Sequence, residues 1–160
     1  MKTLIVYYSL EGNTKYAADK IAQAIGADTL QLVPKKAYSD KGFSKFLWGG
    51  KSALMAEKPE LELIDANLDE YEQIVFGFPV WAGTFTPPLR TFIEENLAAL
   101  KSKKIAAFAC QSGAGGEKAI EKLRALIGAE KLEATAVFRD PKGKPSQDKD
   151  AQIAAFSERL

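Results

Sequence analysis

Ser9-Leu10-Glu11-Gly12-Asn13-Thr14 follows the apolar run Leu4-Ile5-Val6-Tyr7-Tyr8 and precedes a helical pattern that begins near residue 15. A loop of this composition between a strand and a helix suits a phosphate group, because glycine lets the backbone approach an anion and the hydroxyl and amide side chains can donate hydrogen bonds. The free N–H groups and the dipole of the following helix also favour negative charge at its N-terminus. The alternative is an ordinary N-cap, in which Asn13 or Thr14 satisfies the first helical turn.

Length and composition predict one globular domain over residues 1–160. The chain is 46% hydrophobic and 27% charged, which is normal for a protein with a sizeable core. A net charge of +1 gives no general attraction to nucleic acid or to an anionic membrane. The apolar runs are too short for a membrane span or for a signal peptide. We therefore expect a cytoplasmic monomer or homodimer with no nucleic-acid or membrane partner.

Cysteine and histidine usage restricts the chemistry that the side chains can perform. Histidine is absent, which removes imidazole from every mechanism. The single cysteine, Cys110, permits no internal disulfide. We expect Cys110 to be a small buried hydrophobe rather than a redox group, because it has no second cysteine as partner.

Apolar segments of strand length alternate with helical patterns along the chain. The expected strands cover residues 3–8, 30–33, 74–78, 104–109 and 132–138. The first is continuously apolar, as expected for a strand that is buried on both faces. Helical patterns follow from about residue 15 to 25, from Pro87-Pro88 to Leu97, through 120–127 and over 150–160. This alternation predicts an α/β fold with a mostly parallel sheet and helices on both of its faces.

A long segment, residues 35–72, joins the second and third expected strands. Within it, residues 43–48 have a helical pattern. Its second half, residues 57–72, is acidic and is expected to be a solvated face. The first half contains aromatic residues that could either pack in the core under a long loop or cover a bound ligand, namely Tyr38, Phe43, Phe46 and Trp48.

Three loops of unusual composition follow the first, third and fourth expected strands, at residues 9–14, 79–84 and 110–116. In a sheet of order 2-1-3-4-5 these strands are neighbours around the point where the strand order reverses, which is where such sheets bind ligands. The first loop suits phosphate, and the third is rich in glycine and small polar residues. The second carries Trp81, whose position in a loop favours contact with a ligand over a place in the core. Together the loops predict a pocket for a phosphorylated planar ligand.

The order and spacing of these motifs resemble the flavodoxin family over nearly the whole chain. Ser9-Leu10-Glu11-Gly12-Asn13-Thr14 resembles the phosphate loop of that family, Ser/Thr-x-x-Gly-Asn-Thr. Pro79-Val80-Trp81-Ala82-Gly83-Thr84, followed by Pro87-Pro88-Leu89-Arg90, resembles the loop that carries the isoalloxazine ring. The resemblance implies a flavodoxin-like three-layer fold, with a five-stranded parallel sheet of order 2-1-3-4-5, and tight noncovalent binding of FMN.

The resemblance also implies which residues contact FMN. The phosphate would be held by Ser9, Gly12, Asn13 and Thr14. Trp81 would lie against the ring, and backbone groups of residues 82–84 and 111–113 would meet the ring edge. The full expected set is Ser9, Leu10, Glu11, Gly12, Asn13, Thr14, Pro79, Val80, Trp81, Ala82, Gly83, Thr84, Cys110, Gln111, Ser112 and Gly113. No metal ligand or catalytic side chain is expected, because the flavin carries the redox chemistry.

Three features differ from a typical electron-carrying flavodoxin. Such carriers usually place a tyrosine on the ring after the fourth strand, where this chain has Cys110-Gln111-Ser112-Gly113. The chain is nearly neutral rather than strongly acidic, and residues 35–58 form a long connection. Three functions therefore stay open. The favoured one is an electron carrier that serves a redox partner protein or a small-molecule electron acceptor. The others are an FMN-dependent NAD(P)H oxidoreductase acting on a quinone or another small molecule, and an FMN-binding protein without turnover.

Other phosphate-binding α/β classes lack their defining residues in this chain. A low-molecular-weight tyrosine phosphatase needs arginine six positions after its cysteine, where this chain has Gly116. No Gly-Lys-Ser/Thr follows the first strand, as a P-loop requires, and Gly12 alone does not make a dinucleotide-binding Gly-x-Gly-x-x-Gly. A response-regulator receiver needs acidic residues at the end of the first strand, where this chain has Tyr7-Tyr8-Ser9.

Overall fold

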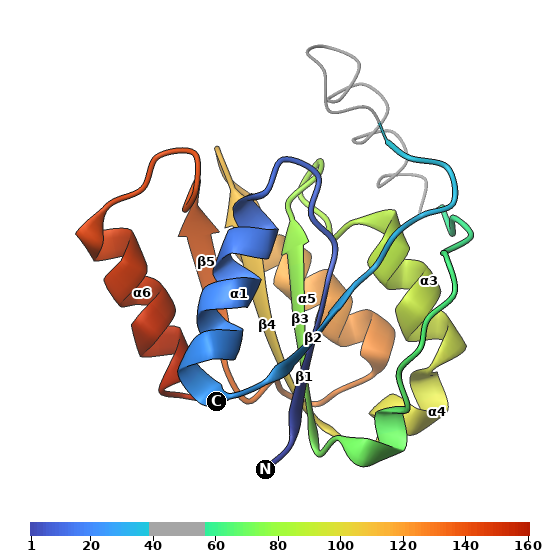
Figure 1. Cartoon of the computed structure of the whole chain (residues 1–160). Coiled ribbons are helices and arrows are strands. Elements are labelled where there is room, and N and C mark those ends of the chain that lie inside the picture. Colours follow the sequence, from blue (N-terminus) through green and yellow to red (C-terminus); the bar gives the residue numbers. More distant parts are fainter. Residues whose placement is uncertain (39–56) are drawn as a thin grey trace.

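A five-stranded parallel sheet in the order β2-β1-β3-β4-β5 is the centre of the molecule (Figure 1). The computed structural model describes residues 1–38 and 57–160. The strands are β1 (Thr3–Tyr7), β2 (Asp28–Gln31), β3 (Gln73–Pro79), β4 (Lys104–Gln111) and β5 (Thr135–Arg139). The predicted α/β class and the predicted order 2-1-3-4-5 are confirmed.

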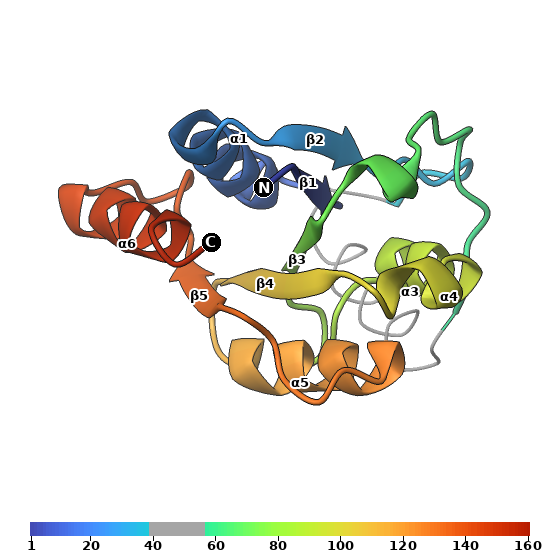
Figure 2. The ribbon, with the colours of Figure 1, turned by 90° about the horizontal axis from the view of Figure 1, so that it is seen from below.

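Helices cover both faces of this sheet and complete a three-layer arrangement (Figure 2). One face carries α1 (Asn13–Ile25) and α6 (Gln147–Ser157). The other carries α3 (Pro87–Glu95), α4 (Leu97–Leu100) and α5 (Gly116–Ile127), and a short 3-10 helix, η1 (Leu68–Glu70), precedes β3. No helix in the described ranges is long and apolar enough to cross a membrane.

The two faces of the sheet make separate hydrophobic clusters, because successive side chains of a strand point in opposite directions. In β1, Leu4 and Val6 belong to the cluster with α3 and α5, whereas Ile5 and Tyr7 belong to the cluster with α1 and α6. All four side chains are buried. The continuous apolar run of the sequence is therefore explained by burial on both sides.

The second strand begins and ends earlier than the predicted range 30–33, because its pairing with β1 runs from Asp28 to Gln31. Leu32 still donates a backbone hydrogen bond to Tyr7 O (2.7 Å), but Val33 accepts one from Glu62 N (2.7 Å) instead. The chain after β2 thus turns away from the sheet and pairs with residues 60–62.

The limits of β5 and of two helices also differ from the predicted ones. β5 spans 135–139 rather than 132–138, since its register with β4 starts at Thr135. The last helix spans 147–157 rather than 150–160, because the Ser146 hydroxyl accepts a hydrogen bond from Lys149 N and caps an earlier start. The expected helix from Pro87 to Leu97 is divided at Asn96, whose side chain donates to Phe92 O (2.8 Å).

The long segment between β2 and β3 is described only at its two ends, and the predicted helix at 43–48 lies outside the described residues. The second end is attached to α3, where the Thr91 hydroxyl donates to Pro59 O (2.7 Å) and Lys58 pairs with Glu94 (2.6 Å). The pKa of Glu94 is lowered by this hydrogen bond and ion pair. The acidic residues of 57–72 are exposed, as predicted, namely Glu57, Glu60, Glu62, Asp65, Asp69, Glu70 and Glu72.

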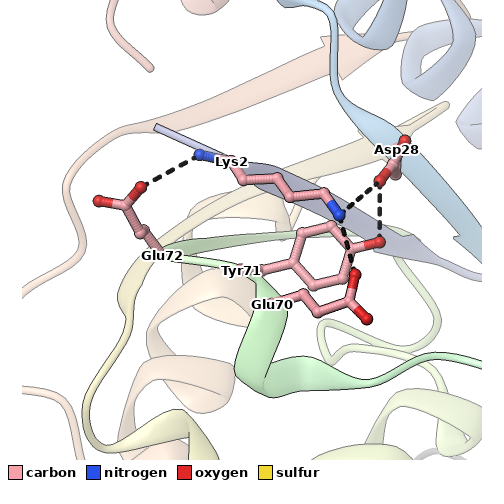
Figure 3. A network of polar contacts seen from close by, with 5 residues as sticks. All are labelled: Lys2, Asp28, Glu70, Tyr71 and Glu72. Atoms are coloured by element: carbon pink, nitrogen blue, oxygen red, sulfur yellow. Dashed lines mark hydrogen bonds and ion pairs between the residues drawn. The ribbon is translucent and has the colours of Figure 1, made fainter.

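At the opposite end of the sheet from the three loops, Lys2 joins the start of β1 to β2 and to the segment before β3 (Figure 3). Its Nζ lies 2.9 Å from the Glu70 carboxylate, 3.8 Å from the Asp28 carboxylate and 4.7 Å from the centre of the Tyr71 ring. The Tyr71 hydroxyl donates to Asp28 (2.8 Å). The hydrogen bond to Glu70 raises the pKa of Lys2. Because the side chains of Lys2, Asp28 and Glu70 are about half exposed, their ion pairs contribute little to the stability of the fold.

Gly77 in β3 leaves the space that the Phe108 ring of the neighbouring strand fills. A Cβ on Gly77 would lie 2.2 Å from Phe108 Cζ, and the same ring packs against Phe138 and Phe156. We therefore expect Gly77→Ala to lower the free energy of unfolding in urea by about 1–3 kcal/mol, through overpacking. The matched control is Gly113→Ala, since a Cβ there meets nothing within 4 Å. Equal stability of the two variants would contradict this account.

Candidate functional site

A cleft of about 230 Å³ lies at the carboxyl ends of β1, β3 and β4. In Figure 1 these strands point toward the top of the picture. The cleft brings together the three loops that the sequence singled out. The lining residues are Ser9, Leu10, Glu11, Asn13, Thr14, Pro79, Val80, Trp81, Ala82, Cys110, Gln111, Ser112, Gly113, Ala114 and Asp140. Of the expected binding residues, Gly12, Gly83 and Thr84 do not line the cleft.

The first loop presents unsatisfied backbone donors at the N-terminus of α1. Gly12 is the N-cap and has a left-handed φ of 102°. Since glycine has no side chain, the N-cap residue itself cannot accept a hydrogen bond from the first turn of the helix. The Ser9 hydroxyl accepts a hydrogen bond from Lys15 N (3.1 Å), whereas Asn13 N and Thr14 N have no acceptor among the described residues. The alternative in which Asn13 or Thr14 caps the helix is therefore wrong. The loop instead leaves two N–H groups available to an anion.

Two polar side chains of this loop are engaged with distant parts of the chain. Asn13 Oδ1 accepts hydrogen bonds from the backbone N–H groups of Lys142 (2.9 Å) and Gly143 (3.0 Å), which leaves its Nδ2 as a donor. Thr14 and Cys110 both line the cleft, and both are buried. Burial raises the pKa of Cys110 to about 12, against the opposing effect of the Thr14 hydroxyl. Cys110 is thus buried, as predicted, and neutral.

The second loop is a tight turn. Trp81 and Thr84 exchange backbone hydrogen bonds of 3.1 and 3.0 Å, and both central residues, Ala82 and Gly83, have left-handed φ values of 51° and 70°. Two positive φ angles are the signature of a type I′ turn. The third loop touches this turn, because a Cβ on Gly115 would lie only 3.1 Å from Gly83 Cα. Glycine at both positions permits this close approach.

Trp81 is held at the edge of the cleft by two tyrosines. Its ring meets Tyr8 edge-on at a centroid distance of 5.7 Å and Tyr38 at 5.2 Å, and the two tyrosine rings lie 6.1 Å apart. Burial raises the pKa of the Tyr8 hydroxyl. Tyr38 comes from the long segment, so at least this aromatic of the segment reaches the site. Outside the described residues lie Phe43, Phe46 and Trp48.

The third loop is fastened to the residues that follow β5. The Ser112 hydroxyl donates to the Asp140 carboxylate (2.6 Å), and Asp140 N donates to Gln111 O (3.0 Å). Arg139 donates to Gly113 O (2.9 Å). These bonds fix the position of the third loop at the edge of the cleft.

Sequence reasoning missed two lining residues, Ala114 and Asp140. Ala114 lies within the third loop, residues 110–116, but directly after the residues 110–113 that the prediction includes. Asp140 directly follows β5, whose carboxyl end lies beside that of β4. The position of Asp140 directly after an expected strand could have indicated that it lies at the site, because all parallel strands end at the same edge of the sheet.

A sequence model described as Flavodoxin matches residues 2–142 of the chain. The chain belongs to the flavodoxin family. Membership agrees with the fold and with the motif order, and it supports FMN as the cofactor of this flavodoxin.

Solved structures show the same fold at low sequence identity. A flavoprotein from Lactobacillus acidophilus NCFM, in complex with FMN, is 21% identical with a TM-score of 0.75, and the alignment covers 98% of each chain. A WrbA-like flavodoxin from Agrobacterium tumefaciens is 16% identical, with a TM-score of 0.65 and coverage of 99% of this chain and 94% of the other. Oxidised flavodoxin 1 from Bacillus cereus is 14% identical, with a TM-score of 0.60 and coverage of 99% and 96%.

The buried Cys110 thiol gives a pH prediction. Its pKa is about 12 in the folded chain against an ordinary value of 9.0, so the unfolded thiol loses its proton at lower pH. The contribution of this group to stability is complete below about pH 9 and is lost as the pH rises toward 12. Urea unfolding should therefore show a steeper alkaline loss of stability in the wild type than in Cys110→Ala. Parallel pH profiles of the two proteins would count against a buried neutral thiol.

Proposed function

We propose that this flavodoxin binds FMN in the cleft and carries electrons between redox partners. The observation that supports the proposal best is the convergence of three loops at the ends of adjacent strands. The first loop offers free backbone donors, the second carries an indole, and the third consists of small polar residues. Such a combination suits a ligand that has both a phosphate and a planar ring. The shared fold of a flavoprotein in complex with FMN adds to this support.

The residues of the first loop fit the phosphate. The N–H groups of Asn13 and Thr14 point from the start of α1, where the helix dipole favours an anion. Ser9 can still donate through its hydroxyl, and Asn13 through Nδ2, because each uses only an acceptor in its described contacts. These four donors would hold and orient the phosphate.

The other two loops would hold the ring and the ribityl chain. Trp81 offers an aromatic surface that Tyr8 and Tyr38 keep in place, and Ala82 at the turn is exposed beside it. The Asp140 carboxylate lines the cleft and, among the described residues, accepts only a serine hydroxyl, so it is suited to accept further hydrogen bonds from ribityl hydroxyls. FMN itself, when bound, supplies the electron-transfer chemistry.

One observation favours a second candidate, an FMN-dependent NAD(P)H oxidoreductase. The third loop presents Ser112, Gly113 and Ala114, which are small and exposed, on the side where carriers of the family usually have a tyrosine. An uncovered ring face would admit a nicotinamide. The partner of the protein is accordingly a redox protein in the first case and a small-molecule electron acceptor in the second.

The proposal is tested by flavin content and by reduction. We expect the purified protein to contain one FMN per chain, and the apoprotein to bind FMN more tightly than riboflavin, because the phosphate adds charge-assisted hydrogen bonds. Anaerobic mixing with NADH and with NADPH should leave the flavin absorbance nearly unchanged if the protein is a carrier. Rapid loss of that absorbance would replace the carrier with the oxidoreductase, and equal affinity for the two flavins would overturn the phosphate site.

A separate prediction concerns the indole. Trp81→Ala should weaken FMN binding by about 1–3 kcal/mol, since it removes aromatic contact area next to the cleft. Trp81→Phe keeps a ring and should recover most of this loss. Titration by quenching of flavin fluorescence measures both variants. If Trp81→Ala binds and quenches FMN as the wild type does, the indole does not contact the ring.

A further inference from the structure

The residues after β5 reach across the molecule to the first loop. Asn13, at the start of α1, accepts backbone hydrogen bonds from Lys142 and Gly143, which are 129 and 130 positions away. Asp140 N and Lys144 N make further backbone bonds, to Gln111 O and to Asp140 O. The backbone at residue 142 is therefore fixed beside the N-terminus of α1.

The side chain of Lys142 continues from this fixed backbone over Gly12. A Cβ on Gly12 would lie 2.8 Å from Lys142 Nζ and 3.3 Å from its Cδ. Because Gly12 is the N-cap of α1, the ammonium lies next to the free N–H groups of the helix. No carboxylate among the described residues forms an ion pair with it.

This placement is electrostatically unfavourable unless an anion is bound. The N-terminus of a helix carries partial positive charge, and a lysine there is repelled by it. The repulsion becomes attraction when a phosphate with a charge of roughly −1.5 to −2 lies between the helix and the ammonium. The other lysine of this helix end, Lys15, already pairs with Asp19 at 2.6 Å.

We propose that Lys142 is a phosphate-binding residue that supplies the counter-charge for the phosphate of FMN. This inference rests on the proposed function, and it assigns to one residue a part of the preference for FMN over the uncharged riboflavin. Asn13 then has a second task besides donating to the phosphate, because its side-chain oxygen holds the loop that carries the lysine. A larger residue in place of Gly12 would displace the end of the lysine side chain and would strain the turn, whose φ is 102°.

The test compares three variants of the apoprotein, Lys142→Gln, Lys142→Arg and Lys144→Gln, each titrated with FMN and with riboflavin. Lys144 is the matched control, since it lies on the same loop and its ammonium makes no hydrogen bond or ion pair with another described residue. At low ionic strength we expect Lys142→Gln to raise the Kd for FMN roughly tenfold, which equals about 1.4 kcal/mol, and to leave riboflavin within about twofold. Lys142→Arg should retain most of the affinity, and Lys144→Gln should match the wild type.

Two further measurements separate charge from structure. Added salt should reduce the difference between Lys142→Gln and the wild type, because a solvent-accessible ion pair is screened. The ³¹P NMR signal of bound FMN should titrate at higher pH in Lys142→Gln, since the ammonium no longer stabilises the dianion.

The outcomes distinguish this inference from the proposed function. If Lys142→Gln binds FMN as Lys144→Gln does, the lysine does not contact the phosphate. If Lys142→Gln weakens FMN and riboflavin equally, the residue only shapes the loop, and the inference is overturned. If the wild type itself binds both flavins equally or binds neither, that result contradicts the proposed function and not only the role of Lys142.

Discussion

The parallel register of β1, β3 and β4 is the constraint on which the site depends. Tyr7 pairs with Gly77, Gly77 with Phe108, and Pro79 with Cys110, so the three strands finish at nearly the same level. Each strand is buried on both faces, which makes a slip in register costly. Loops that leave from these ends must meet, whatever their own composition. The position of the cleft is therefore set by strand pairing, and the lining residues determine only its chemistry.

The loops are held by each other rather than by secondary structure of their own. The first is joined to the residues after β5 through Asn13, and the third through Ser112 and Asp140. The second touches the third where Gly83 and Gly115 approach. Several positions with left-handed φ make these turns possible, and they are concentrated at this edge of the sheet, namely Gly12, Ala82, Gly83, Gly115 and Asp140.

The same arrangement explains why family membership leaves the biological role open. The flavodoxin fold and its FMN cofactor do not distinguish an electron carrier from an oxidoreductase. The residues at the rim of the cleft differ in size, since residues 112–114 are small and exposed whereas Trp81 packs against two tyrosines. A nearly neutral surface also lacks the acidity with which typical carriers dock on basic partners.

The sequence by itself determined the α/β class and the position of three loops, because apolar runs indicate buried strands and the composition of a loop indicates which ligand group suits it. The resemblance to flavodoxins, carried by the motifs of these loops, implied the strand order. Only the tertiary structure decided that Asp140 lines the cleft, that Asn13 anchors a distant loop and that Lys142 lies over Gly12. It also decided the limits of β2, because pairing with β1 outweighs the apolar pattern of residues 32–33. The hydrogen bonds of Asn13 to Lys142 and Gly143 join residues more than a hundred positions apart. Periodicity tells which side of an element is buried but not which remote segment covers it.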